Sequence, residues 1–106
     1  MSSLGSSELY WGDECWWVYV LQCRDGTLYT GITNDLDRRL AMHNSGRGAK
    51  YTRSRIPVKM LCWWPHQTKS EALKAEISFK KLDRKEKLER IKIRSRWIEK
   101  NFPDDG

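Results

Sequence analysis

The sequence predicts a small α+β domain whose elements follow the order ββ-α-β-α-α along the chain. Its 106 residues fit one folding unit and suffice for one ordinary hydrophobic core. An Asp-Gly turn joins two strand-like runs near the start, which indicates a β-hairpin. Helix-capping residues then precede three segments with helical patterns, one before and two after a third strand-like run.

The two predicted hairpin strands flank this turn. Residues 16–23 are rich in aromatic and β-branched side chains, which are typical of strands. Asp25-Gly26 then favours a tight reversal, and residues 27–32 return as the second strand.

The length of the hairpin loop decides which side chains share a face of the sheet. A two-residue loop pairs Tyr19 with Ile32 and leaves Tyr29 on the opposite face. A three-residue loop, with Gly26 in the left-handed αL conformation as a G1 bulge, pairs Leu21 with Tyr29. Both tyrosines then lie on one face. The turn sequence by itself leaves both registers open.

The first helix is predicted directly after the hairpin. Asn34 is its expected N-cap, and Asp35 and Asp37 in the first turn suit the positive end of the helix dipole. The helix is predicted to run to about Asn44, where Gly46 supplies a stop.

This helix has an apolar side and a polar face of chemical interest. Leu36 and Leu40, with Met42, supply the apolar side. Arg39 and His43 are four residues apart, so they stack on one face. They could present a guanidinium fork and a titratable imidazole to a phosphate. The alternative is an ordinary exposed helix face.

A basic, aromatic-bearing loop and a third strand follow. Residues 47–55 are predicted as the loop, before Pro57. Within it, the Lys50-Tyr51-Thr52-Arg53 stretch could stack on and clamp a nucleic-acid strand, or be a solvated loop. The third strand is predicted from Val58 to Trp64, ended by Pro65.

Two further helices complete the predicted domain. Thr68 and Glu71 form a capping-box pattern that opens a helix at about 69–82. A second pattern beginning at Asp83 opens the last helix, to about Arg94.

The expected organisation is a leader at residues 1–14, the folded domain at 15–95 and a tail at 96–106. The leader is Ser-rich and acidic, without the basic and apolar regions of a secretory signal. No apolar run approaches the ~18 residues of a membrane span. We expect a cytoplasmic protein, nucleoid-associated if its source is bacterial.

The three cysteines, Cys15, Cys23 and Cys62, are an odd number with no CxxC pair. This pattern argues against a disulfide framework and against a zinc site. We expect three free, buried thiols in a reducing compartment.

The formal charge of +6 is concentrated in two regions. Residues 24–59 hold eight basic and three acidic residues, and residues 69–100 hold twelve and six. Such an excess suggests a polyanionic partner, because Lys and Arg contacts to phosphates release counterions. The alternative is a solvated helix face with i,i+4 pairs such as Lys85 and Glu89.

Glu76 is the most informative carboxylate. On the predicted 69–82 helix its neighbours at helical spacing are apolar, and a lone carboxylate there is costly to desolvate. A metal ion or a cationic partner would remove that cost. The alternative is an edge-of-stripe Glu76 paired with Lys80 at i+4. Tyr19 and Tyr29, each taken alone, are typical of core or cross-strand packing.

The order of these residues along the chain resembles that of the GIY-YIG nuclease family. The matching segments are Val18-Tyr19-Val20, then Tyr29-Thr30-Gly31, whose tyrosine is nine positions after Val20, then 32–39, His43 to Gly46, Lys74-Ala75-Glu76 and Lys80-Lys81-Leu82. The chain is most similar to the small stand-alone bacterial members and to the nuclease domain of structure-selective resolvases. The first motif reads VYV and the second YTG, so each keeps its tyrosine and the second keeps its glycine.

The resemblance implies a three-stranded antiparallel sheet flanked by helices, with a site on one sheet face. It favours the three-residue hairpin loop, because both tyrosines must reach that site. It implies Gly31 as the motif glycine and Glu76 as the metal-holding residue. The expected catalytic residues are Tyr19, Tyr29, Arg39, His43 and Glu76. The expected nucleic-acid-binding residues are Arg38, Arg47, Lys50, Tyr51, Arg53 and Lys80.

The resemblance further implies an endonuclease that uses one divalent metal, Mg²⁺ or Mn²⁺, and leaves 5′-phosphate and 3′-hydroxyl ends. DNA is the expected substrate. Arg39 would bind the phosphate, and Tyr19 would take the proton of the attacking water. A free phenol has a pKa of about 10. Tyr19 therefore needs either a nearby cation that lowers its pKa or His43 as a proton acceptor.

Two other function classes compete with this interpretation. A non-catalytic nucleic-acid-binding module would bind with strong salt dependence but not cleave. A protein-interaction module would use an exposed tryptophan patch. No appended specificity domain is evident, so a partner protein or a homodimer could supply targeting. Repair, defence and mobile-element roles all remain open.

Overall fold

The computed structural model describes residues 15–103. The predicted leader, 1–14, and residues 104–106 lie outside the described part. The elements, in chain order, are β1 (Trp16–Gln22), β2 (Leu28–Thr33), α2 (Leu36–Asn44), α3 (Lys50–Arg53), β3 (Lys59–His66), α4 (Lys69–Lys80) and α5 (Arg84–Asn101). None of these helices is long and apolar enough to cross a bilayer.

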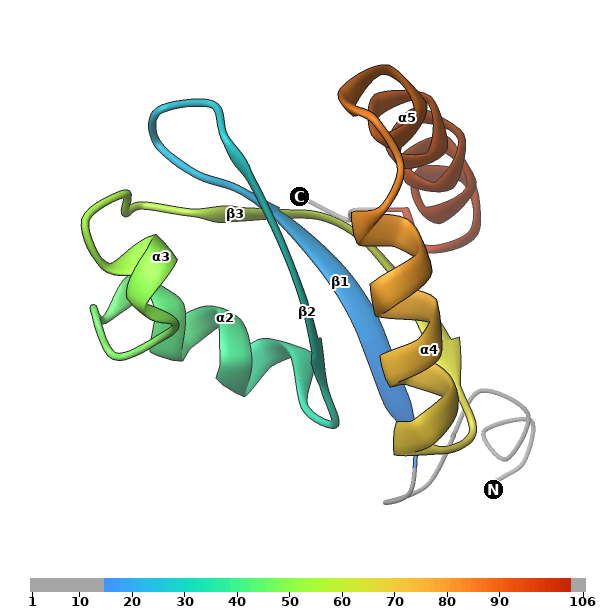
Figure 1. Ribbon diagram of the computed structural model, residues 1–106, viewed down its shortest axis with the longest axis horizontal. Helices are drawn as coiled ribbons and strands as arrows, with labels where there is room; N and C mark the ends of the chain where they lie inside the picture. Colours follow the sequence, from blue (N-terminus) through green and yellow to red (C-terminus); the bar gives the residue numbers. More distant parts are fainter. Residues whose placement is uncertain (1–14, 104–106) are drawn as a thin grey trace.

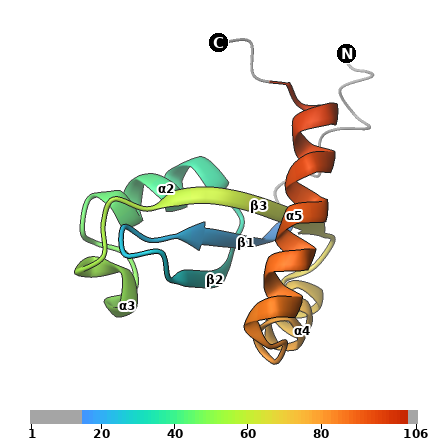
Figure 2. The ribbon, with the colours of Figure 1, turned by 90° about the horizontal axis from the view of Figure 1, so that it is seen from above.

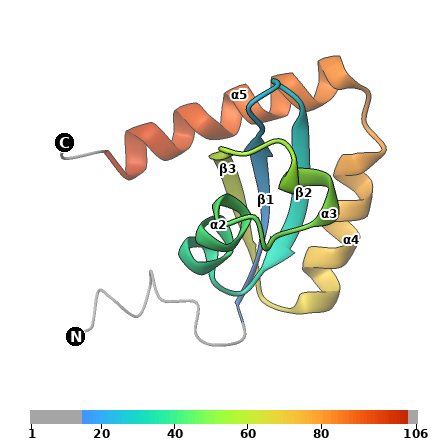
Figure 3. The same ribbon diagram turned by 90° about the vertical axis from the view of Figure 1, so that its left-hand side faces the viewer.

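The three strands form one antiparallel sheet in the order β2-β1-β3. Helices α2 and α3 lie to one side and α4 and α5 to the other (Figure 1). Viewed onto the sheet, α2 and α3 are in front and α5 crosses behind (Figure 3). From above, α4 and α5 lie together, away from α3 (Figure 2). The predicted α+β class is confirmed.

The hairpin adopts the register of the three-residue loop. Gly26 has a φ of +86°, a conformation that favours glycine. Its N–H donates to the Cys23 carbonyl at 2.9 Å, and the Cys23 N–H donates to the Thr27 carbonyl at 2.8 Å. Leu21 therefore pairs with Tyr29, and Tyr19 pairs with Gly31. Both tyrosines point to the same face, as the family resemblance implied.

Strand β3 does not end at Pro65, as we predicted, but includes it. Pro65 pairs with Trp17, and the strand continues to His66. The structure permits this because β3 is an edge strand, where the missing proline N–H has no ladder partner to lose.

The N-terminus of α2 also differs from the prediction, by one residue. The N-cap is Asp35 rather than Asn34, because the Asp35 side chain accepts from the Arg38 N–H at 3.1 Å. The Asp35 N–H in turn donates to Thr33 Oγ1 at 3.0 Å, which holds the cap against the end of β2.

The expected loop 47–55 contains the short helix α3. Gly46, with a φ of +84°, ends α2 as predicted, and the Thr52 and Arg53 N–H groups donate to the Ala49 carbonyl. Our prediction of a loop throughout this stretch was therefore wrong.

Helix α4 begins as predicted, with Thr68 as N-cap, and α5 begins at the Asp83 capping box. However, α5 continues past Arg94 to Asn101. Residues 96–101 of the expected tail are thus helical.

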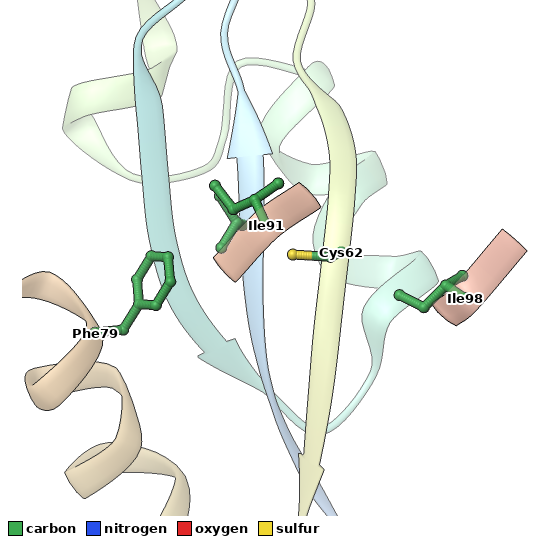
Figure 4. Packing of buried hydrophobic residues seen from close by; sticks show 5 residues of the cluster. Cys62, Phe79, Ile91 and Ile98 are labelled. Atoms are coloured by element: carbon green, nitrogen blue, oxygen red, sulfur yellow. The ribbon is translucent and has the colours of Figure 1, made fainter. Parts of the chain in front are cut away.

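Two hydrophobic clusters lie on opposite faces of the sheet. On the α4 and α5 face, Val20 and Cys62 pack with Phe79, Ile91 and Ile98 (Figure 4). The second cluster faces α2 and contains Tyr19, Leu21, Cys23 and Val58, with Leu36 and Leu40 packed against it. The central strand β1 contributes alternate residues to both clusters, so Tyr19 faces α2.

The three cysteines are free and buried, as predicted. Cys62 lies in the first cluster, where burial raises the pKa of its thiol to about 12. It remains a protonated, apolar packing residue at neutral pH.

Candidate active site

The centre of the candidate site is the hydroxyl of Tyr19. Tyr19 is fully buried, at 0% exposure, and its Oη lies between two side chains of α2. His43 Nε2 is 2.9 Å from Oη, and Arg39 Nε donates to it at 3.4 Å. The spacing of Arg39 and His43 predicted that they share a helix face, and the structure places both on one oxygen.

The charge states at this centre follow from burial. Burial raises the pKa of Tyr19, and this effect is larger than the lowering caused by the hydrogen bond from Arg39. Burial, together with the Arg39 charge, lowers the pKa of His43. The hydrogen bond to Tyr19 raises the pKa of Arg39. At neutral pH the site therefore holds a neutral phenol, a neutral imidazole and a cationic guanidinium.

The lowered pKa of His43 makes stability depend on pH. Below the ordinary histidine value of about 6.5, the unfolded chain binds a proton at this residue that the folded chain does not. The free energy of unfolding should therefore fall as pH decreases from about 6.5, by at most ~1.4 kcal/mol per pH unit, and level off below the folded pKa. Urea unfolding of wild type and His43→Asn between pH 7.5 and 5 measures this. A wild type that gains stability over that range, relative to the variant, would contradict the burial argument.

Tyr29 completes an aromatic group around the centre. Its ring centroid is 6.3 Å from that of Tyr19 and 5.2 Å from that of His43. The Tyr29 phenol also contributes to the raised pKa of Arg39. Tyr19 and Tyr29, the predicted pair of tyrosines, thus both act on the Arg39 guanidinium.

Gly31, the predicted motif glycine, has a steric reason to be there. A Cβ at this position would lie 2.7 Å from the Tyr19 hydroxyl and 2.9 Å from its Cζ. The Tyr19 ring therefore leans across its cross-strand partner, and any side chain at position 31 would displace it.

Glu76, on α4, acts on the same centre through its charge. Its negative charge contributes to the raised pKa of Tyr19. Its side chain is only 14% exposed and forms an i,i+4 ion pair with Lys80 at 3.3 Å. The ion pair that we considered as the alternative is therefore present, and it sits at the edge of the candidate site.

The donor set suits a magnesium ion but limits how it could bind. Among residues 15–103 there is no group of three or more His, Cys, Asp and Glu side chains that could hold a metal. Mg²⁺ usually keeps several waters and is held by one or two carboxylates plus substrate phosphate. Glu76 supplies one such hard oxygen ligand, provided that the Lys80 ammonium gives up its place.

A groove of about 300 Å³ opens beside Tyr29. It is lined by Leu28, Tyr29, Thr30, Tyr51, Lys80 and Lys87. Its two lysines, from α4 and α5, make it suitable for an anionic ligand. Lys80 was among the predicted nucleic-acid-binding residues, but Lys87 was not. Lys87 is one of many basic residues on α5 and has no distinguishing neighbour in the sequence.

Tyr51 lines this groove but is already engaged. Its ring stacks on Tyr29, with centroids 6.1 Å apart and planes 24° apart. The Arg55 guanidinium lies 4.1 Å from the same ring's centroid and forms an ion pair with Asp25. The ring that we predicted to stack on a base thus holds one aromatic and one cationic partner of its own.

The other predicted nucleic-acid-binding residues of the described chain do not bond to the residues around Tyr19. Arg38, Arg47, Lys50 and Arg53 are exposed. Arg53 Nε donates to the Gly48 carbonyl at 3.4 Å. In the described part of the chain, none of these four side chains has a hydrogen bond or ion pair with the residues around Tyr19.

Two residues that were not among the predicted site residues, Thr52 and Gly48, pack against His43. Thr52 is fully buried and its Oγ1 lies 2.8 Å from His43 Nδ1. A Cβ at Gly48 would lie 2.8 Å from the His43 Cα and against its ring. A glycine two residues after a helix stop is an ordinary turn pattern, so nothing in the sequence connects Gly48 with His43.

Known proteins place these features in a family. A family model described as the GIY-YIG catalytic domain matches residues 15–89. A UPF0213 protein of Streptococcus agalactiae is 55% identical over 76 residues, covering 72% of this chain and 86% of that protein. A UPF0213 protein of Bacillus licheniformis is 52% identical over 80 residues, covering 76% and 82%.

Solved structures agree with the sequence comparisons. The solution NMR structure of a UPF0213 protein from Bacillus halodurans has a TM-score of 0.54 and 38% identity, covering 86% of this chain and 97% of that one. A second NMR structure, from E. faecalis, has a TM-score of 0.53 and 49% identity, covering 76% and 85%. By both sequence and fold, the chain belongs to the GIY-YIG family, alongside the small bacterial UPF0213 proteins.

Proposed function

We propose that this chain is a divalent-metal-dependent endonuclease that hydrolyses phosphodiester bonds of nucleic acid, expected to be DNA, and leaves 5′-phosphate and 3′-hydroxyl ends. The observation that carries the proposal is the Tyr19 hydroxyl, held between Arg39 and His43 where the Glu76 charge also acts. This arrangement combines a phosphate-binding cation, a proton route and a metal-binding carboxylate within one small site.

Arg39 has two tasks in this proposal. Its bond to Tyr19 is long, at 3.4 Å, so exchanging it for charge-assisted bonds to phosphate oxygens is favourable. Because Tyr19 is fully buried, water reaches its hydroxyl only when a neighbour moves. Movement of Arg39 toward the scissile phosphate would uncover the hydroxyl when substrate is bound.

The proton then passes from water through Tyr19 to His43. The raised pKa of Tyr19 favours this route over one in which a nearby cation keeps the phenol ionised. His43, neutral and 2.9 Å away, can accept the phenol proton while Tyr19 takes one from the attacking water. Tyr29 would position water or phosphate at the mouth of this route.

Glu76 would hold the metal ion through a carboxylate oxygen. A divalent ion bound there supplies Lewis-acid polarisation of the scissile phosphate and stabilisation of the leaving 3′ oxygen. Lys80, released from Glu76, would then be free to contact a phosphate in the groove that it lines with Lys87.

A non-catalytic nucleic-acid-binding module on the same scaffold is the second candidate. The observation that favours it is the Glu76–Lys80 ion pair, since a carboxylate permanently held by lysine would not bind a metal. The two candidates differ in cleavage, whereas both predict binding that weakens with salt.

Incubation of the full chain with end-labelled single-stranded, duplex, flapped and four-way DNA, and with RNA, separates the candidates. Each substrate is tested with Mg²⁺, Mn²⁺ or EDTA. We expect cleavage with metal, none with EDTA, and products whose 5′ ends carry phosphate. Salt-sensitive binding of every substrate without cleavage would support the second candidate and overturn the first.

A further inference from the structure

We propose that Thr52 is a positioning residue, whose hydroxyl fixes His43 in the tautomer that accepts a proton from Tyr19. The effect of Thr52 on the cleavage rate rests on the proposed function. However, the tautomer of His43 can be measured without any cleavage assay.

The direction of the hydrogen bonds around Thr52 follows from their partners. Thr52 Oγ1 lies 3.0 Å from the Ala49 carbonyl oxygen and 2.8 Å from His43 Nδ1. A carbonyl oxygen only accepts, so we assign the single hydroxyl proton of Thr52 to Ala49, whose carbonyl also accepts from the Thr52 and Arg53 N–H groups. Toward His43 the hydroxyl offers a lone pair, and the proton in that bond must belong to Nδ1.

The proton on Nδ1 decides what the other ring nitrogen does. A neutral imidazole carries one N–H, so Nε2 is then an acceptor. Nε2 faces Tyr19 Oη at 2.9 Å, and the Tyr19 proton therefore points at His43. Arg39 Nε donates to the same Oη. The donors then run in one direction, from Arg39 through Tyr19 and His43 to Thr52 and Ala49.

The tautomer with the proton on Nε2 disrupts two hydrogen bonds of this chain of donors. With the proton on Nε2, the Tyr19 hydroxyl would receive N–H groups from both His43 and Arg39 and could give its own proton to neither. Nδ1 would face the Thr52 oxygen without a proton between them, unless Thr52 released Ala49. A His43 in that state could not take the Tyr19 proton.

The backbone of the α2–α3 connection holds Thr52 in place. Thr52 lies in α3 and is fully buried, and its N–H also bonds to the Ala49 carbonyl, at 3.0 Å. Gly48 packs directly on His43, where a Cβ would lie 2.8 Å from its Cα. The other charged or titratable groups facing His43 are Tyr19, Tyr29 and Arg39. None of them offers Nδ1 an alternative acceptor.

The first measurement needs no variant. Long-range ¹H–¹⁵N correlation spectra of the ¹⁵N-labelled full chain distinguish a protonated from an unprotonated ring nitrogen, and His43→Asn identifies the His43 signals. At neutral pH we expect a protonated Nδ1 and an unprotonated Nε2. A proton on Nε2 would overturn the inference outright.

Variants then test whether Thr52 is the cause. Thr52→Val removes the acceptor with little change of shape, and Thr52→Ser keeps it. Thr33→Val is the matched control, because Thr33 is also a buried threonine, and its hydroxyl bonds only to the backbone of Asp35. We expect Thr52→Val alone to populate the Nε2–H tautomer and to lower the cleavage rate about 10- to 100-fold, by analogy with the loss of a hydrogen-bond partner that orients a metal-ligating histidine. Thr52→Ser, which keeps the hydroxyl, should keep both the Nδ1–H tautomer and the wild-type cleavage rate.

The outcomes separate this inference from the proposed function. A wild type that does not cleave, with a tautomer that changes in Thr52→Val, would remove the nuclease proposal and keep the positioning role. A wild type that cleaves, with a tautomer unchanged in Thr52→Val, would remove the positioning role alone.

Discussion

Replacing Glu76 by glutamine is expected to lower metal-dependent cleavage by at least about a thousandfold. Glutamine keeps the size of the side chain but removes a carboxylate whose charge acts on Tyr19, as the charge of Arg39 also does. Metal ions stabilise such transition states by several kcal/mol, and a loss of ~4 kcal/mol corresponds to about 10³ in rate. Single-turnover cleavage as a function of Mg²⁺ concentration measures the effect.

The same substitution should leave the fold intact. The ion pair lost with Glu76 has an outer partner, Lys80, that is 52% exposed, and pairs of this kind contribute about 1 kcal/mol or less. Glu71→Gln is the matched control, since Glu71 is an exposed glutamate in the first turn of the same helix. If Glu76→Gln cleaves like wild type with the same metal requirement, Glu76 does not hold the metal.

The extent to which the sequence predicts the fold depends on whether local chemistry decides the element. The β1–β2 hairpin and the starts of α4 and α5 follow from turn and capping residues, and they were predicted within a residue or two. The hairpin register did not follow from the turn, because Asp25-Gly26 suits two loop lengths. Only the requirement that Tyr19 and Tyr29 share a site selected the observed one.

The errors arose where tertiary contacts decide the outcome. Helix α5 continues beyond Arg94 because this stretch is attached to β3. Arg94 Nε donates to the Trp63 carbonyl at 2.7 Å, Ser95 Oγ donates to the Leu61 carbonyl at 3.0 Å, and Ile98 is buried in the core. Likewise, Pro65 is tolerated in β3 only because that strand lies at the sheet edge, a position that the sequence does not reveal.

The candidate site shows the same division. The i,i+4 spacing places Arg39 and His43 on one helix face, and the sequence therefore predicted them together. It could not predict that both meet Tyr19, since that contact depends on how α2 packs on β1. Thr52 was noted only as part of a basic loop. Its contact with His43 could not be predicted, because it depends on a short helix that brings the Thr52 hydroxyl to His43.

The second large effect is expected for Tyr19→Phe, which should lower the cleavage rate by about 10²- to 10⁴-fold, the usual contribution of a positioned acid–base group. Phenylalanine keeps the ring over Gly31 but removes the oxygen that joins Arg39 to His43. It also leaves the buried His43 Nε2 without a donor, which should lower the free energy of unfolding by ~1–3 kcal/mol. Rates are therefore compared at a temperature where the variant is fully folded, as shown by its urea unfolding curve.

Thr33→Val separates the loss of the proton route from the loss of stability, because it also removes a buried hydroxyl but does not touch the site. We expect this control to lose stability and keep its rate. In wild type, the rate should also decline at acid pH, as pH falls through the pKa of His43 in the folded protein, which lies below the ordinary value of about 6.5, since protonated His43 can no longer accept from Tyr19. If Tyr19→Phe cleaves within a few-fold of wild type, the route through His43 is wrong. Tyr29, whose phenol acts on the same Arg39 guanidinium and lines the groove, would then be the base to test.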